Sequence, residues 1–133
     1  MKYYLETNIC IYFLKGINEK IKSRLLEKHP DEIKISSIVQ AELLYGAEKS
    51  IKKEDNLKNI KNFLFPFEIV AFGENESNSY SKIRAELEKE GYVIGPNDLL
   101  IAAAVLANGG ILITNNVNEF ERVKNLRIEN WTE

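Results

Sequence analysis

The side chains of this sequence that are best suited to chemistry are acids, amides and a hydroxyl group that lie beside short apolar segments. They are Glu6, Glu42, Asp98, Thr114, Asn115, Asn116 and Glu119. Asp98 is the most telling of them, because it is one of only three Asp residues and directly precedes an apolar run. A carboxylate buried there without a partner would be costly. The pattern therefore indicates a group of acids gathered in one cleft.

Carboxylate and amide oxygens of this kind indicate a site for a hard cation. None of the acids Glu6, Glu42 and Asp98 has a Lys or Arg next to it in the sequence, and oxygen ligands suit Mg²⁺ or Mn²⁺. The matching chemistry is hydrolysis of a phosphodiester, in which one metal lowers the pKa of a bound water and a second, ~4 Å away, can serve the leaving oxygen. The competing interpretation is that Glu6 and Asp98 only favour the N-termini of helices and that Glu42 is a surface acid.

Short apolar segments alternate with helical patterns and predict the elements that must position these acids. Strands are expected over residues 2–5, 33–36, 67–72, 111–114 and 127–131. Helices are expected over residues 9–14, 17–27, 37–49, 75–90, 98–108 and 115–123, with a further exposed helix within 49–62. The expected N-cap residues are Thr7 or Asn8, Ser36 or Ser37, and Asn97.

This alternation predicts a single three-layer α/β/α domain over residues 1–133, with a central parallel sheet and helices on both faces. The chain of 133 residues, 44% of them hydrophobic, is long enough for one core. In an open sheet of this type, ligands bind beyond the carboxyl ends of the strands. The candidate residues are expected at that edge.

Helical periodicity also predicts which side chains point into the core. Those expected to point inward are Ile21, Leu25 and Leu26 in the helix over 17–27, and Ile38, Ala41, Leu44 and Tyr45 in the helix over 37–49. The helix over 98–108 is apolar on nearly all sides and should be buried. We interpret Cys10 and Trp131 as packing residues and His29 as an exposed loop residue.

Composition excludes several classes of protein. One Cys and one His permit neither an internal disulfide nor a structural zinc site. The longest apolar run, 99–107, has nine residues, well short of the ~18 needed to cross a bilayer, and no small-residue cleavage site follows the apolar segment 9–14. We therefore expect a soluble, cytoplasmic protein with no membrane partner.

The charge balance gives no overall attraction to nucleic acid. The 18 Lys and Arg residues against 20 Asp and Glu residues leave a net charge of −2. The densest basic run comprises Lys49, Lys52, Lys53, Lys58 and Lys61. Such a run is more often a solvated helix face, but it could also hold RNA phosphates.

Four ordered segments resemble PIN-domain ribonucleases, specifically the VapC toxins of bacterial and archaeal toxin–antitoxin pairs. They are Tyr3-Tyr4-Leu5-Glu6-Thr7-Asn8-Ile9, Ser36 to Gly46, Ile94 to Ala103, and Thr114-Asn115-Asn116 followed by Glu119-Phe120. Together they extend over the whole chain. The resemblance implies the PIN-like fold, a Mg²⁺- or Mn²⁺-dependent endoribonuclease activity on structured RNA, with tRNA the expected class, a VapB-like antitoxin, a homodimer, and contact with DNA only through the antitoxin.

The resemblance also assigns roles to individual residues. It implies that Glu6, Glu42 and Asp98 bind metal, with Asn116 where many members have a fourth Asp, Glu119 as a further acid and Thr114 as the hydroxyl residue beside the metal. Two residues depart from the family pattern. Glu6 replaces an Asp and is one methylene longer, as in a natural variant or an engineered change that weakens the enzyme, and Asn116 removes one negative charge, which weakens the case for a second metal.

Two functions remain open beside each other. The first is the endoribonuclease, with Glu6, Glu42, Asp98, Thr114 and Asn116 in its catalytic site. The second is a catalytically impaired toxin that serves as a binding module in an antitoxin and DNA repressor complex. For either, Ile11, Tyr12 and Tyr45 are candidate groove residues for an amphipathic antitoxin segment. A phospho-receiver domain is excluded, because it needs a nucleophilic Asp after a strand and a strand-end Lys, and neither is present.

Overall fold

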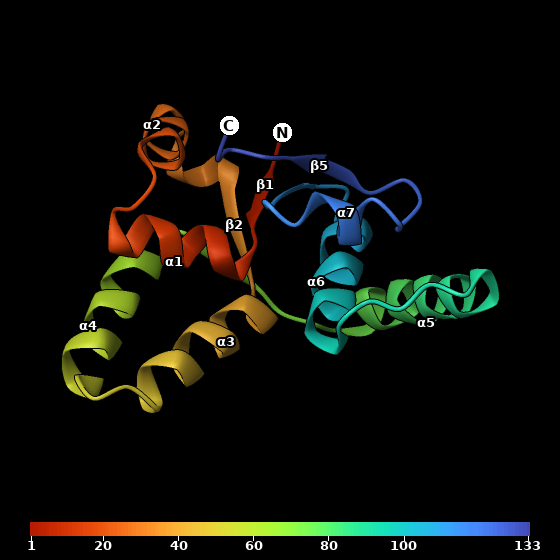
Figure 1. Ribbon diagram of the computed structural model, residues 1–133, viewed down its shortest axis with the longest axis horizontal. Helices are drawn as coiled ribbons and strands as arrows, with labels where there is room; N and C mark the ends of the chain where they lie inside the picture. The colour runs from red at the N-terminus through yellow and green to blue at the C-terminus, as the bar shows by residue number, and fades with distance from the viewer.

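A computed structural model describes all residues, 1–133, and contains five short strands and seven α-helices (Figure 1). The strands are β1 (Tyr3–Leu5), β2 (Ile33–Ser36), β3 (Glu68–Val70), β4 (Ile111–Ile113) and β5 (Arg127–Glu129). The helices are α1 (Thr7–Lys15), α2 (Glu19–Glu27), α3 (Ser37–Glu48), α4 (Lys53–Leu64), α5 (Glu74–Glu90), α6 (Pro96–Ala107) and α7 (Val117–Phe120). A short 3₁₀ turn over Pro30–Glu32 precedes β2.

The strands form one parallel sheet in the order β3-β2-β1-β4-β5. β1 lies at the centre, where Tyr3 is paired with Ile33 of β2 and with Ile111 of β4. From β1 the chain first builds outward through β2 and β3, then returns to add β4 and β5 on the other side. The carboxyl end of β1 is therefore the point at which the sheet changes direction, where α/β proteins place their ligands.

The helices divide into two groups, as Figure 1 shows. Helices α1 to α4 connect β1, β2 and β3 and lie together on one side, and α5 packs closely against α6 on the other. Right-handed crossovers account for this division, because the chain moves across the sheet in opposite directions before and after β3. The predicted three-layer α/β/α fold is confirmed.

The core lies between these layers. Cys10, Trp131 and residues 101–105 of α6 are all buried, as predicted. Because α6 is enclosed by the sheet and by α5, it carries apolar or small side chains on nearly every side. No helix combines the length and apolar character needed to span a membrane.

The inward face predicted for α3 is right at two of its four residues, since Ile38 and Leu44 are half-buried and pack against the core. The buried positions are Val39, Leu43 and Ala47, whereas Ala41 is exposed and Tyr45 is 64% exposed. Apolar residues occur on more than one side of this helix, so periodicity alone does not fix which stripe faces inward. Leu26 of α2 is likewise 68% exposed, although Ile21 and Leu25 are buried.

Two predicted caps are also wrong. Glu6, rather than Thr7 or Asn8, caps α1. Helix α6 begins at Pro96 behind Gly95, so Asn97 lies within its first turn instead of capping it. Proline is well suited to the first helical position, since its missing N–H would have no partner there. Ser36 caps α3 as predicted.

Candidate functional site

The candidate site residues meet at the carboxyl edge of the central strands. Glu6 directly follows β1 and Thr114 directly follows β4, and these two strands are hydrogen-bonded neighbours. Glu42 comes from α3, Asp98 from the first turn of α6 and Glu119 from α7. The structure therefore brings together four acids and the Thr114 hydroxyl from five separate parts of the chain, at the edge of the sheet where the sequence predicted them.

Glu6 is held by the two segments that follow the central strands. Its side chain is only 4% exposed. The Oε2 atom accepts a hydrogen bond from the backbone N–H of Asn8 at 3.0 Å, and Oε1 accepts one from the Thr114 hydroxyl at 3.1 Å. Burial raises the pKa of Glu6, and the carboxylates of Glu42 and Glu119 add to the rise, while the two hydrogen bonds oppose it.

Glu42 joins three helices through its two oxygens. The Thr7 hydroxyl of α1 donates to Oε1, and the Asn97 amide of α6 donates to Oε2 at 3.1 Å. Sequence reasoning missed both donors because it treated Thr7 and Asn97 only as helix caps. Their positions next to Glu6 and Asp98 were the available signal.

Asp98 and Glu119 form a coupled pair of carboxyl groups. Burial, followed by repulsion from Glu119, Glu6 and Glu42, raises the pKa of Asp98 to about 7. Burial of Glu119 acts in the same direction but is outweighed, because hydrogen bonds from the Gly95 N–H (2.7 Å) and the Asn116 amide (2.8 Å) lower its pKa. Below about pH 7, Asp98 therefore carries the shared proton and Glu119 the charge.

Thr114 is fully buried and links Glu6 to Asn116 through its hydroxyl group. Its hydroxyl donates to Glu6 and accepts from the backbone N–H of Asn116 at 3.0 Å. Asn115 does not join the acids, because it is exposed and donates to the Tyr12 hydroxyl. We call the joined set, Glu6, Glu42, Asp98, Thr114, Asn116 and Glu119, the acid cluster.

The acid cluster is not a formed cage: hydrogen bonds link Glu6, Thr114, Asn116 and Glu119 in a chain, whereas Glu42 is held by Thr7 and Asn97 outside the cluster. No three acidic, His or Cys side chains are placed to hold a metal ion between them. The reason is that Glu6 and Glu42 point to threonine and amide donors, while Asp98 and Glu119 are bonded to each other. The oxygens themselves are of the type that hard cations prefer.

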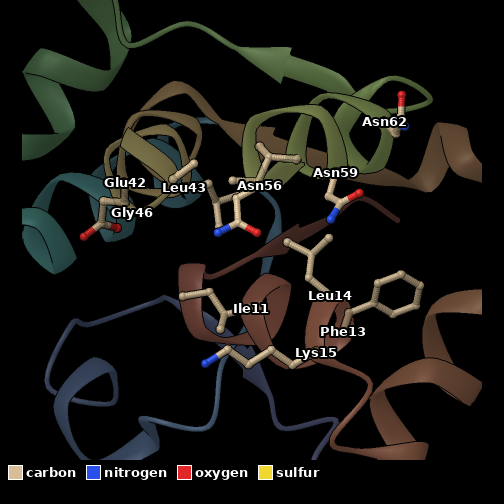
Figure 2. A pocket seen from close by; sticks show the side chains of 12 residues that line it. Ile11, Phe13, Leu14, Lys15, Glu42, Leu43, Gly46, Asn56, Asn59 and Asn62 are labelled. Atoms are coloured by element: carbon tan, nitrogen blue, oxygen red, sulfur yellow. The ribbon is translucent and has the colours of Figure 1, made fainter. Parts of the chain in front are cut away.

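A groove of about 610 Å³ adjoins the acid cluster and shares Glu42 with it (Figure 2). One wall is α1, where Ile11 and Leu14 supply apolar side chains. The other is formed by α3 and α4, including Leu43 and Asn59. Of the three predicted groove residues, only Ile11 lines this groove.

Comparisons with known proteins agree with this architecture. The PIN domain family matches residues 3–126. Ribonuclease VapC2 of Rickettsia felis is 45% identical over 132 residues, covering 98% of each chain. The tRNA(fMet)-specific endonuclease VapC of Salmonella typhimurium is 38% identical over 131 residues, again covering 98% of each chain.

The fold comparison gives the same result. The crystal structure of VapBC2 from Rickettsia felis, bound to a DNA fragment from its promoter, superposes with a TM-score of 0.90 at 45% identity, covering 98% of this chain and 99% of the other. The five-stranded parallel sheet, the acids at its carboxyl edge and the matches along nearly the whole chain lead to one assignment. The chain belongs to the PIN-domain family and, within it, to the VapC ribonucleases of VapBC toxin–antitoxin systems.

Proposed function

We propose that this chain cleaves structured RNA by metal-dependent hydrolysis at the acid cluster. The observation that carries the proposal is the convergence of Glu6, Glu42, Asp98 and Glu119 on one partly buried edge, where burial, followed by repulsion among these acids, raises the pKa of Asp98 to about 7. Acids held together at this cost indicate a functional site more often than a structural one. A cation would relieve the repulsion.

The candidate ligands of Mg²⁺ or Mn²⁺ are Glu6, Glu42 and Asp98, with Asn116 and Glu119 beside them. When bound, such an ion would lower the pKa of a water molecule and neutralise charge on the phosphate. The protein contributes by orienting the acids: Thr114 fixes Glu6, and Gly95 and Asn116 fix Glu119. Because Asp98 must lose its proton to bind a cation, metal affinity should rise with pH up to about 7.

The decisive experiment is incubation of the purified protein with total RNA in Mg²⁺, in Mn²⁺ and in EDTA, followed by mapping of the new RNA ends. We expect cleavage only with a divalent ion. Asp98→Asn should abolish cleavage and weaken Mn²⁺ binding in calorimetry, whereas Asn115→Ala, at a polar residue outside the acid cluster, should leave Mn²⁺ binding unchanged. Cleavage in EDTA, a requirement for zinc, or unchanged Mn²⁺ binding by Asp98→Asn would refute the proposed site.

For the substrate we infer tRNA. The support is the relative from Salmonella typhimurium, which is described as a tRNA(fMet)-specific endonuclease. Purified tRNA and an unstructured messenger fragment, offered at equal concentration, should give faster cleavage of the tRNA. The opposite preference would leave the nuclease intact and remove tRNA as its substrate.

For the partners we infer a homodimer and a VapB-like antitoxin that occupies the groove and connects the complex to DNA. Similar VapBC complexes have been solved with DNA, including the one from Rickettsia felis. The groove offers apolar side chains to an amphipathic segment, and an antitoxin Arg could reach Glu42 at its end. A monomer in ultracentrifugation, or no binding of the antitoxin encoded beside this chain, would contradict this inference.

The alternative, an impaired toxin that only binds its antitoxin, is favoured by one observation. Both carboxylate oxygens of Glu6 already accept hydrogen bonds, one from the backbone N–H of Asn8 in α1 and one from the Thr114 hydroxyl. The same incubation with RNA distinguishes the two, since an impaired toxin would bind its antitoxin but release no new RNA ends in Mn²⁺.

A further inference from the structure

Helix α3 presents an exposed stripe that begins at the acid cluster. Glu42, Tyr45 and Lys49 are spaced three and four residues apart, which places them on one side of the helix. The buried stripe of Val39, Leu43 and Ala47 lies on another side. Tyr45 therefore follows Glu42 by about one turn, or ~4.5 Å along the axis.

Packing against the core does not explain why an aromatic residue occupies position 45. Its side chain is 64% exposed and is not among the half-buried aromatic residues, such as Tyr12, that pack against the core. Its neighbour is the Lys49 ammonium group, which lies 4.8 Å from the centre of the ring. Proteins that bind single-stranded nucleic acid use an exposed aromatic ring to stack on a base and a nearby cation to contact a phosphate.

Lys49 is also free of acidic partners. Lys53 is paired with Glu48 and Lys124 with two glutamates, but no carboxylate lies within salt-bridge distance of Lys49. Its charge is therefore available for an anion. Lys52, Lys58 and Lys61 of the basic run also make no ion pair, so the feature that distinguishes Lys49 is its position against the Tyr45 ring.

The helix surface next to Tyr45 is open on the groove side. Gly46 follows Tyr45, and a side-chain carbon added there would meet no atom within 4 Å. Figure 2 shows Glu42 and Gly46 together at the outer end of the groove. On the same side, Glu42 accepts a hydrogen bond from the exposed Asn97 amide, so this part of the acid cluster faces solvent.

We propose that Tyr45 and Lys49 hold one nucleotide of the RNA substrate beside the acid cluster, the Tyr45 ring stacking on its base and the Lys49 ammonium group contacting its phosphate. The proposal rests on the proposed ribonuclease function and names the part of α3 that positions the substrate. RNA is favoured over a protein segment because a cation without an acidic partner and a largely exposed ring occur together, next to acids that would act on a phosphodiester.

The test compares Tyr45→Ala, Tyr45→Phe and Lys49→Gln with the wild type. A fluorescent single-stranded RNA oligonucleotide is titrated in EDTA, where no metal-dependent cleavage occurs, and anisotropy gives the Kd. Tyr45→Ala should weaken binding by about 5-fold or more, whereas Tyr45→Phe keeps the ring and should stay within about 2-fold. Lys49→Gln should weaken binding and lower the salt dependence by about one phosphate contact.

Phe65→Ala is the matched control. Phe65 is an exposed aromatic residue, 84% exposed, at the end of a different helix, and its loss should not change RNA binding. In cleavage assays with Mn²⁺, Tyr45→Ala should raise KM and leave kcat nearly unchanged, as expected for lost substrate binding. Melting temperatures of all variants show whether each is folded. If Tyr45→Ala is not folded, Lys49→Gln still tests the proposal, and unchanged RNA binding by that variant would overturn it.

The outcomes separate this inference from the ribonuclease itself. If the wild type cleaves RNA and Tyr45→Ala binds and cleaves it equally well, the Tyr45 inference is overturned and the nuclease stands. If Tyr45→Ala weakens only the binding of the antitoxin, this surface belongs to the protein partner and the inference is again overturned. A wild type that neither binds nor cleaves RNA would overturn both proposals.

Discussion

At the scale of single residues, the length of Glu6 is the feature most directly connected to rate. The side chain reaches back to the Asn8 N–H and across to the Thr114 hydroxyl. Glu6→Asp shortens that reach by one methylene and keeps an acid that caps helices well. We expect metal-dependent RNA cleavage to rise by at least ~10-fold, since ~1 Å of misalignment can cost on the order of 100-fold, with little change in the melting temperature without metal.

Initial rates in Mn²⁺ and melting curves in EDTA would measure these two effects separately. Equal cleavage by the two forms would mean that Glu6 is accommodated or does not bind the metal. Two inactive forms that still bind Mn²⁺ would support the binding-module alternative.

The raised pKa of Asp98 makes stability depend on pH in a predictable direction. A carboxyl group whose pKa is about 7 when folded, against an ordinary value of 3.8, holds its proton more tightly in the folded chain. Its contribution to stability is complete below about pH 4 and is lost as pH rises through about 7. In EDTA, the melting temperature should therefore fall between pH 5 and pH 8.

Asp98→Asn should flatten this dependence, because an amide cannot lose a proton. Some slope should persist, since the pKa of Glu6 is also raised by burial. Added Mg²⁺ should raise the wild-type melting temperature most at pH 8. A melting temperature that rises from pH 5 to pH 8 in EDTA would contradict the raised pKa of Asp98 beside Glu119.

At the scale of elements, the start of β4 depends on a close approach to β1. A side-chain carbon added at Gly110 would collide with the ring of the buried Tyr4 and lie 3.3 Å from the Lys2 carbonyl oxygen. We expect Gly110→Ala to destabilise the fold by about 1–3 kcal/mol, the usual cost of overpacking a core. Chemical denaturation would measure it.

Gly46→Ala serves as the opposite case. Gly46 lies inside α3 with nothing within 4 Å of an added carbon, and alanine should stabilise the helix by about 0.5–1 kcal/mol. If both substitutions change the free energy of unfolding equally, the contact with Tyr4 is not what destabilises Gly110→Ala.

The elements also show how far the sequence could predict the structure. The strong apolar run of α6 predicted its burial, because a helix with no polar side has only one stable environment. The inward face assigned to α3 was right for Ile38 and Leu44 but wrong for Ala41 and Tyr45, because apolar residues surround more than one side of this helix. The acids of the site could be predicted from their places after strands, but the Glu42–Asn97 hydrogen bond could not, since it joins residues 55 positions apart through the packing of α3 and α6.

At the scale of the whole molecule, the groove and the acid cluster share Glu42 but are otherwise built from different residues. A change deep in the groove should therefore separate partner binding from cleavage. We expect Leu14→Arg to weaken antitoxin binding by at least ~10-fold, because a charged side chain would replace an apolar one in the groove wall, and to leave RNA cleavage by the free protein within about 2-fold.

Leu26→Arg is the control, because Leu26 is 68% exposed and does not line the groove. Titration of the antitoxin against each variant would measure antitoxin binding, and a cleavage assay on each free variant would measure RNA cleavage. Loss of antitoxin binding by both variants, or by neither, would argue against the groove as its binding site.

The pairing of β1 with β4 has a consequence for synthesis of this chain on the ribosome. The central strand and Glu6 are made first, but their partners Ile113 and Thr114 follow more than a hundred residues later, and Glu119 later still. At ~5–20 residues per second, Glu6 and Thr114, which lie 108 positions apart, are made several seconds or more from each other. Any nascent chain that has not yet reached β4 therefore lacks the second strand end on which the acid cluster is built.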